Sequence, residues 1–206
     1  MNVEYVYFLV EEPSMEAFLR ELLPRILGDV PFAVHSFQCK HDLLNRLPDR
    51  LRGYAAWLPE NHRVVVVVDR DADDCRKLKQ RLEGCALEVG LATRSHRKQE
   101  RFIVINRIVV EELESWYFGD WQAVRAAFPR VSPTVTRRAP FRDPDAIAGG
   151  TWEAFERVLK RAGYFKSGLR KIEAARAIAP HLVPARNRSH SFQVLRQALL
   201  ELGGTG

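Results

Sequence analysis

Residues 63–74 read RVVVVVDRDADD and join five consecutive valines to a run of aspartates. Five valines in a row fit a strand that is buried on both faces, which is typical of the centre of a parallel sheet rather than its edge. Four aspartates lie within residues 69–74, directly after the valines. The stretch therefore predicts a central strand over residues 63–68 with a cluster of carboxylates at its carboxyl end.

Strands and helices are expected to alternate on both sides of this central strand. Pro48 is expected to interrupt one of the helices. The order β-α-β-α-β-α-β predicts an α/β fold, with a four-stranded, mostly parallel sheet flanked by helices. The expected strands cover residues 3–10, 32–37, 63–68 and 102–109, and the expected helices cover residues 13–26, 42–58 and 73–89.

The chain beyond residue 110 is predicted to be helical. The expected helices cover residues 111–118, 121–128, 152–162, 169–179 and 191–200. Thr151 is a good N-cap for the third of them, and residues 129–144 form a loop rich in proline and arginine. We therefore expect an α/β domain over residues 1–120 and a basic C-terminal helical extension, residues 121–206, packed on it.

The two parts of the chain differ in charge. Residues 1–120 carry 17 Lys and Arg against 20 Asp and Glu, whereas residues 121–206 carry 15 against 6. An acidic site beside a basic surface suits an enzyme that acts on a polyanion, since the basic surface attracts phosphates. An ordinary solvated basic helical face explains the second half equally well.

The chain shows no membrane or secretion signal. Its longest apolar run, residues 64–68, is too short to span a bilayer, and the N-terminus lacks the order of a signal peptide. Three cysteines, an odd number at wide spacing, do not form a disulfide framework. We therefore expect a cytoplasmic protein without membrane contact.

Three acidic clusters follow three of the predicted strands. They are Glu11-Glu12, residues 69–74 and residues 111–114. In a parallel sheet all three lie at the same edge, where like-charge repulsion requires either neutralising cations or raised pKa values. Carboxylate oxygens are the ligands that Mg²⁺ and Mn²⁺ prefer, so the pattern predicts a divalent-metal site suited to phosphoryl chemistry. Acidic capping of the following helices is the alternative, and it explains single clusters better than all three.

Other acidic motifs fit less well. The stretch VVVVVDRDAD resembles the nucleophile motif of haloacid-dehalogenase-type phosphatases, but Asp73 stands where threonine is expected. An EF-hand loop needs glycine and glutamate where this chain has Asp74 and Gln80. A phosphoacceptor receiver domain would carry a lysine after a later strand, and this chain has no obvious counterpart to it.

A glutamate after the first strand, with Asp-x-Asp after a later apolar strand, resembles the Toprim domain of topoisomerases, primases and overcoming-lysogenization-defect-type nucleases. The segments LVEEPSMEAFLRELLPRIL, VVVVVDRDADDC, NRIVVEELESWYFGDW and GLRKIEAARAIAPHL further resemble the bacterial family called domain of unknown function 4276, over nearly the whole chain. The resemblance implies a Toprim-like Rossmannoid fold.

The Toprim resemblance also implies roles for individual carboxylates. Glu11 is expected to act as the acid/base or metal-orienting group, and Asp69 and Asp71 to bind metal, which makes these three the catalytic set. Asp73 is expected to assist through a second ion or water. Toprim enzymes often carry glycine after the first glutamate, where this chain has Glu12.

The third cluster completes the predicted metal site. Glu111 and Glu114 are one helical turn apart and are expected to share a face at the far wall of the site. Glu112 is expected to point elsewhere.

Basic residues of the second half are candidate contacts to nucleic-acid phosphates. The set comprises Arg137, Arg138, Lys166, Arg170, Lys171, Arg186 and Arg188. Residues 187–192 are densely polar, and they either fold back against the acidic edge or cap the last helix with Ser191.

These patterns favour a Mg²⁺- or Mn²⁺-dependent nuclease that cuts DNA or RNA. The resemblance implies an ATPase partner encoded nearby and a role in anti-phage defence, and the chain itself has no Walker A motif. Two alternatives stay open: a non-catalytic Toprim-like regulatory or assembly subunit, and a small-molecule phosphatase or nucleotide hydrolase.

Overall fold

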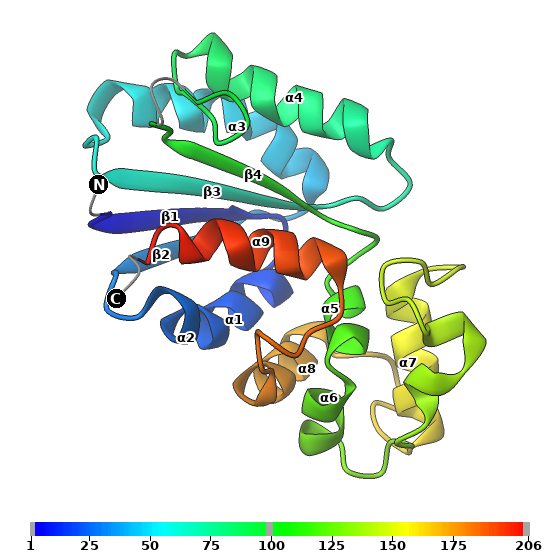
Figure 1. Cartoon of the computed structure of the whole chain (residues 1–206). Coiled ribbons are helices and arrows are strands. Elements are labelled where there is room, and N and C mark those ends of the chain that lie inside the picture. The colour runs from blue at the N-terminus through cyan, green and yellow to red at the C-terminus, as the bar shows by residue number, and fades with distance from the viewer. Residues whose placement is uncertain (1–2, 98–100, 204–206) are drawn as a thin grey trace.

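The sheet of the computed structural model, which describes residues 3–97 and 101–203, confirms the predicted α/β class (Figure 1). All neighbouring strands pair in parallel, in the order β2-β1-β3-β4. The valine-rich strand is therefore one of the two central strands. The four strands are β1 (Tyr5–Val10), β2 (Phe32–Ser36), β3 (His62–Asp69) and β4 (Val104–Val109).

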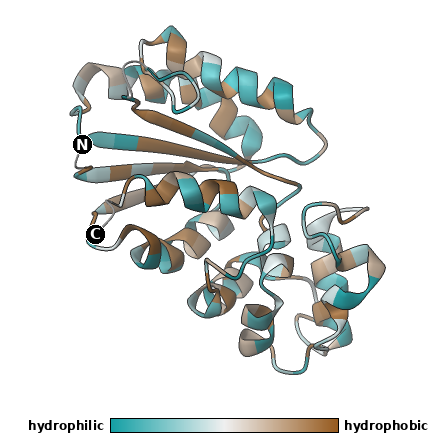
Figure 2. Cartoon of the chain, viewed as in Figure 1, coloured by the Kyte–Doolittle hydropathy of each residue, from teal (hydrophilic) through white to brown (hydrophobic). Residues whose placement is uncertain are grey.

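Helices cover both faces of the sheet (Figure 1). One face carries α3 (Lys40–Trp57) and α4 (Cys75–Glu88), and the other carries α1 (Pro13–Leu22), α2 (Pro24–Leu27) and α9 (His190–Leu200). Hydrophobic residues run along the strands, as Figure 2 shows, and they belong to two buried clusters, one on each face.

The valines of β3 divide between these two clusters. Val65 and Val67 pack on the α1 side, and the alternate valines of the strand pack on the α3 side. Because side chains alternate along a strand, Asp69 is directed to the same side as Val65 and Val67. The strand that decides the fold thus also decides which face receives its terminal carboxylate.

Four helices lie beyond the carboxyl ends of the strands (Figure 1). Helix α9 then returns to contact β4 and α2. The hydrophobic cluster on the α1 side runs without a break across residue 120, the expected boundary between the two parts of the chain. No helix of the described residues has the length and apolar character needed to cross a membrane. The four helices are α5 (Glu114–Gly119), α6 (Trp121–Ala127), α7 (Thr151–Arg161) and α8 (Lys171–Ile178).

Pro48 does not interrupt α3, so the expected break there is wrong. The helix runs continuously from Lys40 to Trp57 with Pro48 inside it. Proline removes one backbone hydrogen bond from a helix. In α3 the burial of an inner face, which includes Leu43, Leu47 and Leu51, offsets that loss.

Two predicted helix caps differ from the observed ones. Thr151 is the first residue of α7, and Gly150 occupies the N-cap position. The hydroxyl oxygen of Ser189, rather than Ser191, caps α9 by accepting the N–H of Phe192 at 3.2 Å. In both cases the predicted cap lies one or two residues too far along the chain.

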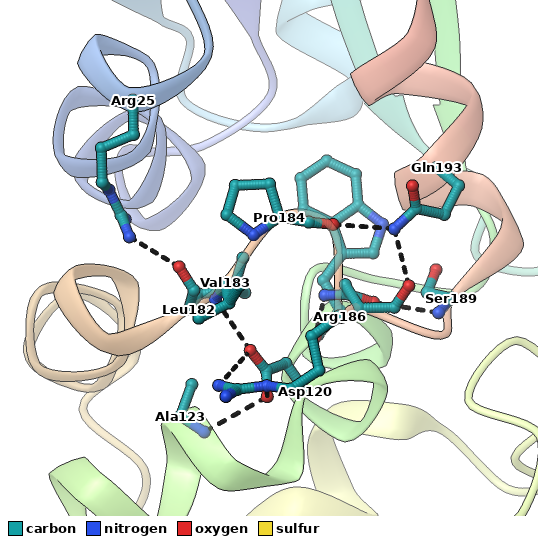
Figure 3. A network of polar contacts seen from close by, with 11 residues as sticks. Arg25, Asp120, Ala123, Leu182, Val183, Pro184, Arg186, Ser189 and Gln193 are labelled. Carbon is teal, nitrogen blue, oxygen red and sulfur yellow. Dashed lines mark hydrogen bonds and ion pairs between the residues drawn. The ribbon is translucent and has the colours of Figure 1, made fainter.

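Asp120 joins the segment between α8 and α9 to α6, as Figure 3 shows. Its side chain is buried and accepts the N–H groups of Ala123 and Val183. Arg186 donates two hydrogen bonds of 2.8 Å to the same carboxylate. Arg186, a predicted phosphate contact, thus has its guanidinium bound to a buried carboxylate. Its contact with nucleic-acid phosphate stays a prediction.

Candidate active site

Asp69 is a buried carboxylate at the carboxyl edge of the sheet. It ends β3 and is 5% exposed. Among the described residues no donor reaches its Oδ1 atom. Burial, followed by the charges of Glu11 and Glu114, raises the pKa of Asp69 well above its usual range. A buried carboxylate with an unpartnered oxygen is costly to keep, and this cost is typical of a functional group.

Glu11 lies directly beside Asp69. It follows β1, which pairs with β3 in a register that aligns Val10 with Val67. Its Oε2 atom accepts the backbone N–H of Asp69 at 3.1 Å. Burial raises the pKa of Glu11 to about 7, against the hydrogen bond from Asp69, and the charge of Asp71 adds to the increase. Glu11 therefore exchanges its proton near neutral pH.

Helix α5 brings Glu114 to the same place. Glu114 is 1% exposed, and among the described residues its Oε2 atom has no hydrogen-bond partner. Burial raises its pKa to about 7, while nearby Lys171 opposes the increase. The charge of Glu114 also acts on Asp69, which places the two carboxyl groups close together.

Tyr117 is a member of this site that the sequence analysis did not identify. It lies one turn after Glu114 on α5 and is almost fully buried, and its hydroxyl has no partner among the described residues. Burial and the charge of Glu114 raise the pKa of Tyr117 well above its usual range, so the phenol stays protonated and able to donate. The three-residue spacing from Glu114 was the available signal.

The loops after β3 and β4 continue side by side beyond the sheet. Arg70 donates its backbone N–H to Val109, and Asp71 donates its own to Glu111 at 3.1 Å. Asp71 and Glu111 have φ angles of 50° and 63°, in the left-handed region that favours glycine. Such strained positions persist where the surroundings fix them, and they concentrate at functional sites.

Lys40, the first residue of α3, holds two of the predicted metal ligands. Its ammonium lies 3.1 Å from Asp71 and 2.6 Å from Asp73, and it also donates to the carbonyl of Arg70. These two aspartates are therefore bound to an ammonium group, while the charge of Asp71 still acts on Glu11 and Asp69.

The acidic residues after β4 point in three directions. Glu111 forms an ion pair with Arg70. Glu112 accepts the hydroxyl of Thr151 and the N–H of Trp152, both at 2.9 Å, at the start of α7. Because α5 begins at Glu114, Glu111 lies before the helix, and the expected shared helical face with Glu114 is wrong. Glu112 is thus bound at the start of α7, and its charge still acts on Glu114 and Lys171.

Two of the predicted phosphate contacts stand at the rim of the acidic edge. Lys171, at the start of α8, lies 3.5 Å from the carboxylate of Glu12. Burial works to lower the pKa of Lys171, but the carboxylates of Glu114 and Glu12 outweigh it, so the pKa is raised. Lys171, Arg170 and Arg176 line a 640 Å³ pocket that also includes Glu12. Basic groups thus border the carboxylates on this side.

The remaining predicted phosphate contacts are spread over the helical part. Arg138 lines a smaller pocket of 170 Å³ with Arg130 and Arg161. Arg137, Lys166 and Arg188 are exposed. Residues 187–192 do not reach the acidic edge as a loop; the side chain of Asn187, for example, is buried and donates to the carbonyl of Trp116.

The carboxylates at this edge do not form a complete metal cage. Within residues 3–97 and 101–203, no group of three or more His, Cys, Asp or Glu side chains is placed so that it could hold a metal ion. The donor set still fits Mg²⁺ or Mn²⁺, because Asp69 and Glu114 each present a buried, unpartnered oxygen. Magnesium is usually bound through one or two carboxylates, with water and substrate phosphate completing its shell.

The raised pKa of Glu114 predicts a pH-dependent stability. Its folded pKa of about 7 lies above the usual value of 4.5, so the folded protein keeps a proton that the unfolded chain loses. Stability is therefore full below pH 4.5 and falls as the pH rises to 7, by an amount on the order of 3 kcal/mol. Urea unfolding in EDTA measures the free energy of unfolding at pH 5 and at pH 8. Its decrease between these two pH values should be smaller for Glu114→Gln than for the unchanged protein. Equal losses in the two proteins would contradict a buried, protonated Glu114.

Fold and site together define an α/β protein with a buried carboxylate cluster at the carboxyl edge of a parallel sheet. The chain belongs to the family described as Domain of unknown function (DUF4276), which matches residues 10–200. This membership confirms the family resemblance seen in the sequence.

Two solved structures are similar to the chain at low identity. The C-terminal region of the Xanthomonas campestris pv. campestris OLD protein is 19% identical with a TM-score of 0.46, covering 96% of this chain and 94% of that one. The C-terminal region of the Burkholderia pseudomallei OLD protein is 19% identical with a TM-score of 0.48, covering 97% and 100%. Both likenesses are too distant to support a statement about activity. A comparison with curated proteins found no match.

Proposed function

We propose that the chain is a Mg²⁺- or Mn²⁺-dependent phosphodiesterase that cuts nucleic acid. The observation that carries the proposal is the buried carboxyl of Asp69, with an unpartnered oxygen and with Glu11 and Glu114 beside it. No structural ion pair accounts for this carboxyl among the described residues. Cation binding would offset the cost of the buried charge.

The proposed roles follow from burial and position. Asp69 and Glu114 supply oxygens to the cation, and Glu11 accepts a proton from the attacking water, since its pKa of about 7 suits a general base near neutral pH. A bound divalent cation polarises the phosphate and lowers the pKa of water. Asp71 and Asp73, the other predicted ligands, form the outer part of the site with Lys40 and are not in this inner set.

The phosphate side of the site is proposed to lie over α8. Lys171, Arg170 and Arg176 border Glu12 and the acidic edge, and they offer cationic groups to a polyanion. Arg137 and Arg138 are exposed elsewhere on the helical part and are further candidate phosphate contacts. A nucleic-acid backbone is the substrate that uses both an acidic cation site and a basic rim.

Cleavage assays test the proposed activity directly. Purified protein is incubated with supercoiled plasmid and with single-stranded RNA, in Mg²⁺, in Mn²⁺ and in EDTA. We expect cutting of at least one substrate with metal and none in EDTA. Inertness toward both substrates in both metals, alone and with its genomic neighbour, would refute the proposal and favour a non-catalytic subunit.

Lys171→Gln is expected to weaken substrate binding rather than chemistry. Removing one phosphate-facing cation should raise KM about tenfold. It should also make the slope of log affinity against log salt concentration shallower by about one. Arg125→Ala, which removes an exposed arginine on α6, is the matched control and should change neither. A fall in kcat at constant KM would contradict the assigned role.

The proposal also includes an ATPase partner and a role in anti-phage defence. They rest on the Toprim-like resemblance, since no described contact identifies a partner. Co-purification of the chain with the product of a neighbouring ATPase gene, together with metal-dependent cutting that requires ATP, is the expected result.

A further inference from the structure

Another pocket lies away from the acidic edge, between α3 and the β1–β2 side of the sheet. It has a volume of 530 Å³, within the range of small-ligand sites. Its walls combine aromatic and basic side chains from three elements. They include Tyr7, His35, Arg46, Arg50, Tyr54 and Trp57.

Three aromatic rings form one wall of this pocket. Tyr7 and Tyr54 lie 5.3 Å apart between ring centroids, and Trp57 lies 5.9 Å from Tyr7 and 5.6 Å from Tyr54. Trp57 is 56% exposed and is the most exposed of the large hydrophobic side chains described. Two neighbouring rings hold the indole of Trp57 in place, and much of its surface is in solvent. It can therefore stack against a planar ring of a ligand.

The charges beside the rings favour an anion. Arg50 has no hydrogen-bond or ion-pair partner among the described residues, and its charge acts on His35 and Tyr54. Burial, and then Arg50, lowers the pKa of His35, so this ring stays neutral and can exchange hydrogen bonds. Asp49 is the one carboxylate in the lining, and it is paired with Arg52.

Helix α3 connects this pocket to the carboxylate edge. Lys40 at its start contacts Asp71 and Asp73, and Trp57 ends it. Arg46, Arg50 and Trp57 follow at spacings of four and seven residues, which places them along one side of the helix. The first and last residues of this 18-residue helix lie about 25 Å apart along its axis, a distance that a strand of several nucleotides can cover.

We propose that this pocket binds a nucleotide of single-stranded nucleic acid, with the base stacked on Trp57 and a phosphate beside Arg50. Aromatic faces stack on any base, and guanidinium groups bind phosphate, so the combination suits a strand without sequence preference. The inference rests on the proposed substrate class but not on the proposed chemistry. A single strand bound at the carboxylate edge would then run along α3 to this pocket.

Gly53 permits a test that leaves rings and charges in place. It lies on α3 between Arg50 and Trp57, lines the pocket, and has no atom within 4 Å of where a Cβ would stand. Gly53→Leu should therefore be accommodated by the helix, where leucine is more favourable than glycine, while filling the pocket.

Fluorescence anisotropy of a fluorescein-labelled twelve-thymidine DNA strand, measured in EDTA, is the experiment. Trp57→Leu and Gly53→Leu should each weaken binding about tenfold, and Trp57→Phe, which keeps a ring, should stay within about threefold. Arg125→Ala is the matched control and should bind normally. An abasic strand of equal length should bind about tenfold more weakly than the thymidine strand to the unchanged protein.

Two results would overturn the inference. One is equal affinity of the unchanged protein, Trp57→Leu and Gly53→Leu for the thymidine strand. The other is displacement of the strand by thymidine monophosphate at equal concentration, which would assign the pocket to a free nucleotide. Because EDTA prevents metal-dependent cutting, a protein that binds through Trp57 and never cuts refutes the nuclease proposal alone.

Discussion

Replacing Asp69 by asparagine is expected to lower the rate of metal-dependent cleavage about 1000-fold. The carboxylate is proposed to hold the cation, whose loss costs several kcal/mol of transition-state stabilisation. Asparagine keeps the shape of the side chain, so the loss reflects charge and not packing. Plasmid cleavage at saturating Mn²⁺ measures it. A variant with more than a tenth of the original rate would contradict the assignment.

The same variant should be more stable than the original protein in EDTA at pH 8. Asp69→Asn removes a buried carboxyl whose pKa is raised by burial, and so removes the cost of ionising it. The melting temperature should rise by roughly 5 °C. Glu60→Gln, the control, removes an exposed carboxylate that lies 3.7 Å from Arg101 and should leave the melting temperature unchanged. Lower stability of Asp69→Asn would indicate a structural carboxylate.

Asp120→Ala is expected to destabilise the protein by about 3–5 kcal/mol. The change leaves Arg186 without its buried partner and removes the acceptor for Ala123 and Val183. Urea unfolding measures the loss. Asp49→Ala, which removes an exposed ion pair with Arg52, should cost less than about 1 kcal/mol. Similar small losses for both would show that the Asp120 network does not stabilise the helical part.

The sheet could be predicted from the sequence because its signals are local. Five valines require burial on both faces, and helices long enough for crossovers separate the strands. The parallel order then brings Glu11 and Asp69 to one edge, as the strand ends suggested. The same local reasoning failed at Pro48, where burial of the inner helix face outweighs the lost hydrogen bond.

Long-range partners could not be predicted from local patterns. Lys40 reaches Asp71, 31 residues away in sequence, and Asp73 beyond it, and nothing near Lys40 marks it as their counterion. The sequence around Arg186 indicates only a surface cation, since its partner Asp120 is distant in sequence and is brought beside it by the fold. Glu111 was assigned to a helical face, but the backbone turns through a positive φ angle before α5 begins.

Crystals grown or soaked in Mn²⁺ and measured for anomalous scattering test the central claim most directly. The account predicts an anomalous peak within about 2.2 Å of a carboxylate oxygen of Asp69, with Glu114 in the same coordination shell. A structure at saturating Mn²⁺ with no peak beside Asp69 would contradict it, as would a peak confined to Asp71 and Asp73.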